Sequence, residues 1–450
     1  MRAGAASSGV GAALSRRGFL SAAAVTGAGA LLAGCGGGQS AQEAATGTGQ
    51  EFTGTYEGPQ VDLAYWNGFT GGDGPFMREM VNKFNSDHDN IKVTMNTIQW
   101  ADYYQKVPAA VLAGKGPDVG IMHVEQLATF AVRNIILPLD DLTEEVQLQE
   151  NDFIPAIWQA GVYNEKRYGV PLDVHSLAQY YNSDLISKGG QDTPPEDDPA
   201  FSQYLTKLNG AGAAQPFWMP TRWPAHLMFL SLLWQFGGEP YSEDGTRATF
   251  DSEAGQQALS WMVDRVKQGH SPRNVGVDTQ YTAFKNGKVA VTWDGIWQIN
   301  DLKSTAANLN WDMSPLPKIG EDNAVWANSH NFVLYKQTQG DDNKTQAAKM
   351  FIAEISQASS EWAKSGMIPA RNSERNGDAF KQLPQAKIAA QEDSFRFLPQ
   401  IPGVGDVQVQ TLELAVNRAV LGQQSPKDAL TSAATQASKL MQANKKKFEG

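Results

Sequence analysis

Apolar residues recur along the chain in two different periods, and their order predicts alternating strands and helices. Short apolar runs bounded by glycine or polar residues are typical of strands, whereas apolar residues three or four apart indicate a helix face. The pattern predicts strands at 61–66, 91–99 and 117–124, with helices from 75 onward and at 101–116. Strands and helices that alternate at this pitch favour a parallel or mixed sheet covered by helices.

The alternation continues into the second half of the chain. The pattern predicts a buried helix at 226–238, amphipathic helices at 254–267 and 343–357, a strand, turn and helix at 288–301, a strand at 331–335 and helix from 407 to 444. Residues 188–200 are polar and rich in proline, which indicates a turn region. Sheets of this class bind ligands in loops at the carboxyl ends of their strands, so residues there are the first candidates for a site.

The first 34 residues have the pattern of an export signal. Arg16 and Arg17 precede a small and apolar stretch that is too short and too rich in alanine and glycine to span a bilayer. The arginine pair followed by Gly-Phe-Leu resembles a twin-arginine signal. The sequence LAGC resembles a bacterial lipobox, which implies a lipid on the sulfur of Cys35, the only cysteine. An ordinary signal or a short membrane anchor is the alternative. We expect residues 35–57 to form a flexible tether.

Composition narrows the range of possible functions and domain arrangements. The leader carries three arginines and no acidic residue, so the net charge of −11 becomes about −14 without it. An acidic chain argues against nucleic-acid binding, which depends on neutralising phosphates. About 390 residues follow the tether, enough for two domains with substantial cores and no disulfide.

Six segments, in this order, resemble the family 1 extracellular solute-binding proteins of bacterial ABC importers, the class of maltose-binding protein. They are AYWNGFTGGDG, GKGPDVGIMHVEQLATFA, YGVPLDVHSLAQYYNSDL, FKNGKVAVTWDGIWQI, WANSHNFVLY and SGMIPARNS. The resemblance implies a two-lobed α/β fold of the type II periplasmic-binding-protein class, each lobe a mixed sheet flanked by helices, with a ligand cleft at the hinge. It implies lobe 1 at 58–170 plus 316–370 and lobe 2 at 171–315 plus 371–450. The expected crossings are at 168–171, at 313–318 and near Arg371.

The same resemblance implies a function. We expect a substrate-binding lipoprotein, exported and anchored on the outer face of the cytoplasmic membrane, that captures a carbohydrate between its lobes and delivers it to the permease of an ABC importer. We expect a monomer with no enzymatic activity, no cofactor and no nucleic-acid partner.

Sugar chemistry and the resemblance together select the candidate site residues. A sugar presents hydroxyl groups and apolar ring faces, so its site combines hydrogen-bonding side chains with flat aromatic rings. The predicted ligand-binding residues are Trp66, Asn67, Thr70, His123, Glu125, Gln126, Asp173, His175, Trp234, Asp294, Gly295, Trp297, His330 and Arg371. Trp297 is the strongest, since the resemblance places it where the family stacks an aromatic ring on sugar. At His175 the resemblance implies an acidic contact, which leaves the particular sugar open.

Other interpretations of these residues remain. Trp66 and Trp234 fit core packing, Asp294 a helix cap and Arg371 a structural hinge. His123 has no second histidine or cysteine at metal-ligand spacing, so we expect no metal site. A glycosidase would need two carboxylates flanking one glycosidic bond, which acidic residues of this set can supply. The same fold binding glycerol phosphate, a polyamine or iron is a further alternative.

The lipobox makes one prediction about the mature protein. Intact-mass measurement of protein from a host that performs lipidation should give a chain beginning at Cys35 plus its acyl groups. A mass that corresponds to an unmodified thiol would overturn the interpretation.

Overall fold

The computed structural model describes residues 53–146, 148–211 and 216–449, which belong to one compact unit. The export signal, Cys35 and all but the last five residues of the predicted tether lie outside the described residues. Within the described part of the chain, no helix has the length and apolar character needed to cross a membrane.

The first sheet has a parallel half and an antiparallel half. Its strands lie in the order β2 (Ile91–Thr97), β1 (Val61–Asn67), β3 (Val119–His123), β13 (His330–Tyr335) and β4 (Ile136–Leu137), and β7 (Val170–Pro171) also pairs with β13. β1 runs parallel to β2 and β3, whereas β13 is antiparallel to β3. Strands β1, β2 and β3 therefore end at the same edge, where the chain continues into loops and helices.

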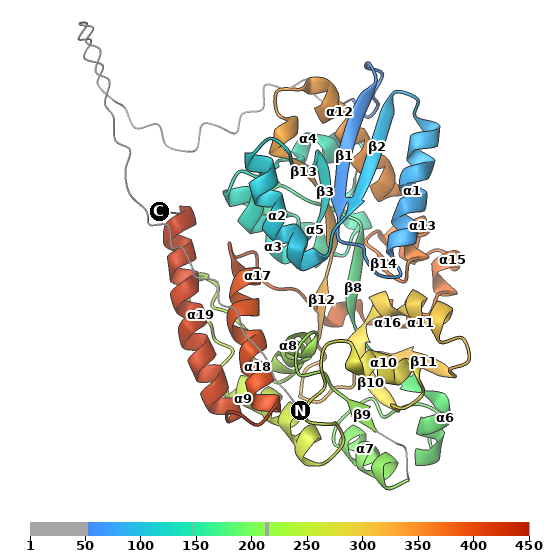
Figure 1. The fold of residues 1–450 in the computed structure, drawn as a ribbon, viewed down its shortest axis with the longest axis vertical. Helices are drawn as coiled ribbons and strands as arrows, with labels where there is room; N and C mark the ends of the chain where they lie inside the picture. Colours follow the sequence, from blue (N-terminus) through green and yellow to red (C-terminus); the bar gives the residue numbers. More distant parts are fainter. Residues whose placement is uncertain (1–52, 147, 212–215, 450) are drawn as a thin grey trace, which may run out of the picture. The chain divides into compact units, whose positions relative to one another are not determined.

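Helices cover both faces of this first sheet (Figure 1). The four longest are α1 (Gly74–Asp87), α2 (Trp100–Leu112), α3 (Val124–Val132) and α12 (Asp342–Gln357). Neighbouring residues of β13 belong to different apolar clusters, because side chains alternate across a strand. Phe332 packs with Tyr65 and Phe351, and Val333 belongs to a second cluster with Tyr103.

The second sheet is built around β8 (Asp173–Asn182), all ten residues of which are buried. Four strands pair with it antiparallel: β10 (Val291–Gly295), β11 (Trp311–Ser314), β12 (Val325–Asn328) and β14 (Ile368–Pro369). At the margins, β9 (Phe217–Trp218) runs parallel to β10, and β15 (Phe395–Arg396) runs parallel to β12. A strand buried along its whole length is the expected centre of a sheet that is covered on both faces.

The remaining elements are mostly helices, and α8 is completely buried. They are α4 (Asp140–Glu145), α5 (Pro155–Ala160), a β5–β6 hairpin (Val162–Tyr163 and Lys166–Arg167), α6 (Ser183–Ile186), α7 (Ala200–Gly210), α8 (Ala225–Gln235), α9 (Glu253–Lys267), α10 (Thr279–Lys285), α11 (Ile299–Thr305), α13 (Ser359–Ala363), α14 (Asn372–Arg375), α15 (Asp378–Lys381), α16 (Ala386–Ala389), α17 (Val404–Val407), α18 (Glu413–Val420) and α19 (Pro426–Glu449).

Most elements predicted from periodicity are confirmed, but the helix predicted from 407 to 444 is interrupted at 421–425, between α18 and α19. The helices predicted from 75 and at 101–116, 226–238, 254–267 and 343–357 appear as α1, α2, α8, α9 and α12. The strands predicted at 61–66, 91–99, 117–124 and 331–335 appear as β1, β2, β3 and β13. Each of these elements is long or strongly patterned, which is why local periodicity finds it.

The chain passes from one sheet to the other at Leu172 and again at Ser329. β7 pairs in the first sheet and β8 begins the second, so this change of sheet directly follows residues 168–171, where a crossing between lobes is predicted. The crossing predicted at 313–318 is wrong, because β11 and β12, on either side of it, both pair with β8. Residues 325–328 and 368–369 therefore belong to the second sheet, although the predicted boundaries assign both segments to lobe 1. The lobe boundaries otherwise stay a prediction.

Candidate ligand-binding site

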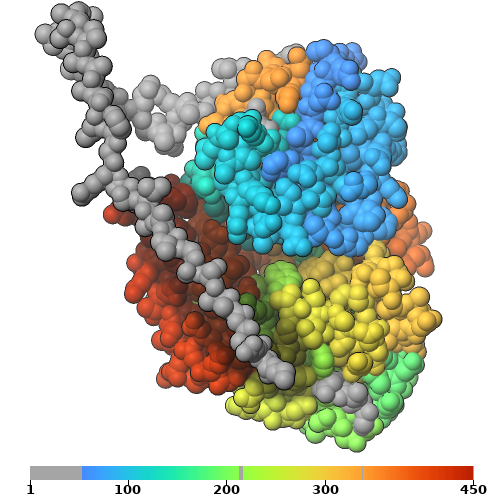
Figure 2. Space-filling view, viewed as in Figure 1, coloured from blue at the N-terminus to red at the C-terminus, as the bar shows by residue number. Residues whose placement is uncertain are grey.

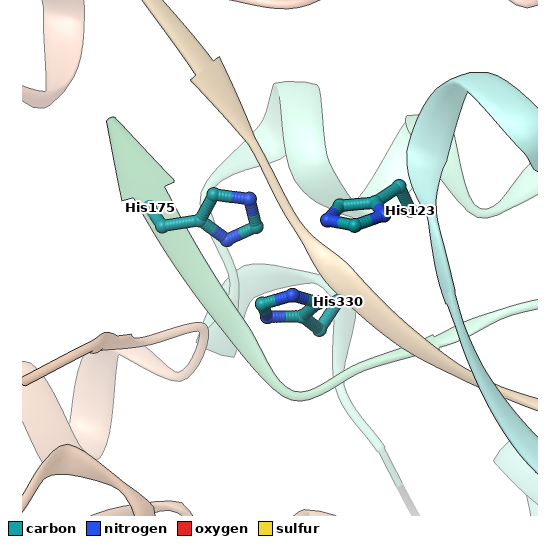
Figure 3. A group of neighbouring side chains, drawn as sticks. All are labelled: His123, His175 and His330. Atoms are coloured by element: carbon teal, nitrogen blue, oxygen red, sulfur yellow. The ribbon is translucent and has the colours of Figure 1, made fainter. Parts of the chain in front are cut away.

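Three histidines meet where the chain crosses between the sheets (Figure 3). His123 ends β3 and lies opposite His330, the first residue of β13. His175, on β8, lies opposite Asn328, which is two residues before His330. The ring centroids are 4.3 Å apart for His175 and His330, 4.8 Å for His123 and His330, and 5.6 Å for His123 and His175. One histidine from the second sheet therefore faces two from the first.

Asp173 holds two of the three rings. Its carboxylate accepts hydrogen bonds from Nδ1 of His175 (3.2 Å) and of His330 (2.8 Å), from the backbone N–H of His330 (3.1 Å) and from Nε1 of Trp362 (2.6 Å). Burial acts to raise the pKa of Asp173, but the electrostatic attraction of His330 and the hydrogen bonds from His175 and His330 outweigh burial and hold the pKa well below its usual range. A charged carboxylate accepts from Nδ1–H, and in a neutral imidazole bound in this way Nε2 carries the lone pair.

His123 is held by a different partner. Its Nδ1 lies 2.7 Å from the hydroxyl of Tyr104, and that hydroxyl also accepts the backbone N–H of His123 at 3.0 Å. Burial lowers the pKa of both His123 and His330. At neutral pH the two imidazoles are therefore uncharged, and each carries a hydrogen on one nitrogen and a lone pair on the other.

Aromatic rings surround the histidines on both sides. From the first sheet, Trp100 lies 4.4 Å from His123 and stacks over His330 at 5.5 Å. From the second, Trp297 and Trp326 each lie 6.0 Å from His175. Figure 2 shows the surface hollowed between α2 and α3, in cyan, and the green and yellow residues of α8 to α10.

On each side of the histidine group, a tryptophan ring packs against a glycine. A Cβ added at Gly68 would lie 2.0 Å from the Trp100 ring, and a Cβ added at Gly295 would lie 2.1 Å from the Trp297 ring. Both values are far inside van der Waals contact, so each ring is packed directly on bare backbone. At Gly295 the group that approaches the backbone is the Trp297 ring.

The structure brings together five of the predicted residues: His123, Asp173, His175, Trp297 and His330. Glu125 and Gln126 lie next to this group on α3. The Glu125 carboxylate accepts from Asn328 at 2.6 Å, and burial raises its pKa. Gln126 lies against Gly405 of α17, because a Cβ there would be 2.2 Å from the Gln126 amide nitrogen.

The structure gives the other predicted residues different surroundings. Trp66 packs against the apolar cluster of α2 and α3. The indole of Trp234 donates to Glu239 and lines a cavity of about 290 Å³ with residues that include Asp322 and Arg396. Arg371 donates to Asp152 at 2.8 Å. These contacts agree with the alternative interpretations, core packing and a structural arginine.

Two predicted residues at the end of β1 and in the loop after it differ in burial. Asn67 is fully buried and accepts from the Phe69 backbone, whereas Thr70 is exposed. Phe69, which was not predicted, is the residue that reaches the histidines, with its ring 4.9 Å from His330. Trp100, Tyr104 and Trp362 were also missed. Tyr104 lies within the helix predicted at 101–116, whereas Trp100 and Trp362 lie outside the predicted elements.

Asp294 is buried without a cationic partner. Its carboxylate accepts from the backbone N–H of Gly295 at 2.8 Å and from the amide of Gln280 at 3.2 Å. Burial raises its pKa to about 7 despite these donors. The amide oxygen of Gln280 has no partner, so a protonated Asp294 has an acceptor beside it. No side-chain cap is formed here, contrary to the helix-cap alternative.

Spacing along the chain predicts no metal site at His123, but it does not register which strands lie side by side. The three histidines come from three strands, and one potential ligand atom of each lies within 4.8 Å of the others. Sequence separation hides this grouping, which appears only when the strands are paired.

Comparison with known proteins agrees with this architecture. The structure is similar to the GacH receptor of Streptomyces glaucescens, solved unliganded and with acarbose (TM-score 0.75, 21% identity, 85% of this chain and 99% of that one). It is also similar to the sugar-binding protein MalE of Xanthomonas citri (TM-score 0.74, 21% identity, 86% and 99%). The fold is therefore the two-lobed α/β fold of solute-binding proteins, as predicted.

Sequence comparison identifies the family. Residues 79–388 match the family model described as bacterial extracellular solute-binding protein, and the chain belongs to this family. A putative binding protein of Brucella abortus is 24% identical over 379 residues, 82% of this chain and 90% of the relative. The galactooligosaccharide-binding protein of Bacillus subtilis is 22% identical over 376 residues, 80% and 85%.

The burial of Asp294 predicts a pH-dependent stability. The folded pKa of about 7 exceeds the unfolded value of about 3.9, so the folded state binds the proton more tightly and loses stability as the pH rises between these values. Asp294→Asn removes this loss. We expect the variant's unfolding free energy, relative to the parent, to increase by on the order of a few kcal/mol from pH 4 to pH 8. Denaturant titrations at several pH values measure it, and a pH-independent difference would contradict the assignment.

Proposed function

We propose that the protein is the carbohydrate-binding component of a bacterial ABC importer. It captures a mono- or oligosaccharide between its two lobes and delivers it to the membrane permease. Several similar proteins are sugar binders by name, including the maltotriose-binding protein of Pyrococcus abyssi and the maltodextrin-binding protein of Bacillus subtilis. Exported, lipid-anchored through Cys35 and monomeric, the protein holds the sugar but does not cleave it.

The observation that carries the proposal is the combination of rings and acceptors at the crossing. Trp100 and Trp297 come from opposite sides of the histidine group. Flat indoles suit the C–H faces of a sugar ring. The lone pairs of His175 and His330 suit its hydroxyl hydrogens, because their Nδ1 atoms already donate to Asp173.

The carboxylates favour binding over hydrolysis. A glycosidase needs an acid and a base or nucleophile that reach the glycosidic bond. Asp173 is fully buried and already accepts four hydrogen bonds. Asp294 is likewise buried and bonded to Gly295 and Gln280. Neither group is placed to donate or accept a proton at a bound sugar.

A ligand screen tests the proposal directly. Thermal unfolding of the protein should shift upward with at least one mono- or oligosaccharide, because a ligand that binds only the folded state stabilises it. Sugars that shift the midpoint should remain chemically intact after prolonged incubation. Shifts with polyamines or glycerol phosphate but with no sugar would overturn the carbohydrate assignment, and turnover would overturn the assignment as a binder.

Trp297 should contribute measurably to sugar affinity. Trp297→Ala should weaken binding by at least about 1 kcal/mol, roughly fivefold in Kd, because an aromatic face is lost. Gly295→Ala should weaken it as well, since the new Cβ displaces the Trp297 ring. Isothermal titration with the sugar found in the screen measures both effects.

Trp311→Ala is the matched control for this experiment. Trp311 is a half-buried tryptophan of the same sheet, but its ring packs on Tyr180 at 5.9 Å. Affinity equal to the parent is expected for this control. Equal affinity in Trp297→Ala would remove Trp297 from the site.

A further inference from the structure

We propose that His123, His175 and His330 form a binding site for one divalent transition-metal ion. Zn²⁺ is the ion used to test it. The ion is held by the three Nε2 atoms at the crossing between the sheets. The site is carried by the imidazole geometry alone, but Nε2 of His175 and of His330 cannot hold an ion and accept from a sugar hydroxyl at the same time, so an ion and a sugar compete for these atoms.

The ring orientations are those that metal-binding histidines require. An imidazole binds a metal through one nitrogen while its other N–H is commonly hydrogen-bonded to a carboxylate, a backbone carbonyl or water. Here Nδ1 of His175 and Nδ1 of His330 are engaged by the two oxygens of Asp173, at 3.2 and 2.8 Å. Nδ1 of His123 is engaged by the Tyr104 hydroxyl at 2.7 Å. In all three residues Nε2 is the nitrogen left for an ion.

The spacing of the ligand atoms needs an adjustment. One potential ligand atom from each histidine lies within 4.8 Å of the others, and Figure 3 shows the three rings around a common space. Imidazole nitrogens bound to one Zn²⁺ at about 2.0–2.1 Å are about 3.4 Å apart in a tetrahedral site. Ligand atoms up to 4.8 Å apart therefore have to come closer together when they bind one ion.

The ligand type selects the class of ion. Three neutral imidazoles suit Zn²⁺, Cu²⁺, Ni²⁺ and Fe²⁺, whereas Mg²⁺ and Ca²⁺ require oxygen ligands. Three protein ligands leave one position of a tetrahedral ion open to water or to a small ligand. The structure therefore assigns an open three-histidine site rather than a closed structural one.

The source of the ligands gives the ion a structural effect. His123 and His330 belong to the first sheet, and His175 belongs to the second. A single ion bound to all three joins the two sheets at their crossing. Metal binding should therefore stabilise the folded protein against heat, and a chelator should reverse the effect.

Metal binding is tested on purified, tag-free protein stripped with a chelator. Titration calorimetry and metal analysis after dialysis should give one Zn²⁺ per chain, with no binding of Mg²⁺. Co²⁺ should give the intense visible absorption of a four-coordinate ion. His175→Ala and His330→Ala should each lower the Zn²⁺ affinity by at least about 100-fold. A stoichiometry well below one, or an octahedral Co²⁺ spectrum, would overturn the proposal.

Two further variants keep the test decisive if a histidine variant unfolds. Tyr104→Phe removes only the oxygen that holds His123 and should weaken Zn²⁺ binding by about 10–100-fold. His88→Ala is the matched control, because His88 pairs with Glu354 away from this cluster, and it should bind as the parent does. Loss of Zn²⁺ binding in His88→Ala would place the ion elsewhere. Unchanged Zn²⁺ binding in Tyr104→Phe, and in whichever of His175→Ala and His330→Ala folds, would do so too.

The two proposals fail separately. Sugar affinity measured in the presence of chelator reports on the carbohydrate site without metal. Sugar binding with no Zn²⁺ binding would overturn the metal site and leave the carrier function standing. Zn²⁺ binding with no sugar binding would overturn the carrier function and leave the metal site standing.

Discussion

The arrangement of the site depends on one buried carboxylate. Asp173 begins β8, next to the crossing at Leu172, and its four donors come from β8, β13 and α13. A carboxylate removed from water loses solvation worth several kcal/mol, and only these donors replace it. Separating the two sheets at this point would leave the charge buried and unpaired. We infer that any movement of one sheet relative to the other turns about Asp173 and keeps these bonds.

Around this fixed point the two sheets use the same packing device. Gly68 has no side chain that would hold the Trp100 ring away from the backbone. Gly295 has none that would hold the Trp297 ring away. Each indole rests on bare backbone at the end of a strand that leads to the crossing. A ring packed on rigid backbone loses little conformational entropy when it contacts a ligand, because its movement is already restricted. The histidines are positioned by Asp173, and the rings by glycine.

Sequence could predict the elements but not their partners. Helical or strand periodicity is a local property, so α1, α2 and β1 were found from their own residues. The crossing at Ser329 depends on β12 pairing with β8, residues about 150 positions apart in the chain. Such pairing leaves no local signal, because β12 has only four residues. The same reason explains why three histidines on three strands showed no relation in the sequence.

The chemistry of His175 also becomes clear only with its partner. The resemblance implies an acidic contact at this position, and a free imidazole is a poor substitute because either nitrogen can carry the hydrogen. Asp173 removes that ambiguity, since its carboxylate accepts from Nδ1 and leaves Nε2 as an acceptor. In its neutral form His175 therefore offers an acceptor at Nε2, as a carboxylate oxygen does. Because His330 is held in the same way, the crossing presents two fixed acceptors side by side. Such a pair selects ligands that bring hydrogen-bond donors or a positive charge, and it disfavours those that bring another acceptor.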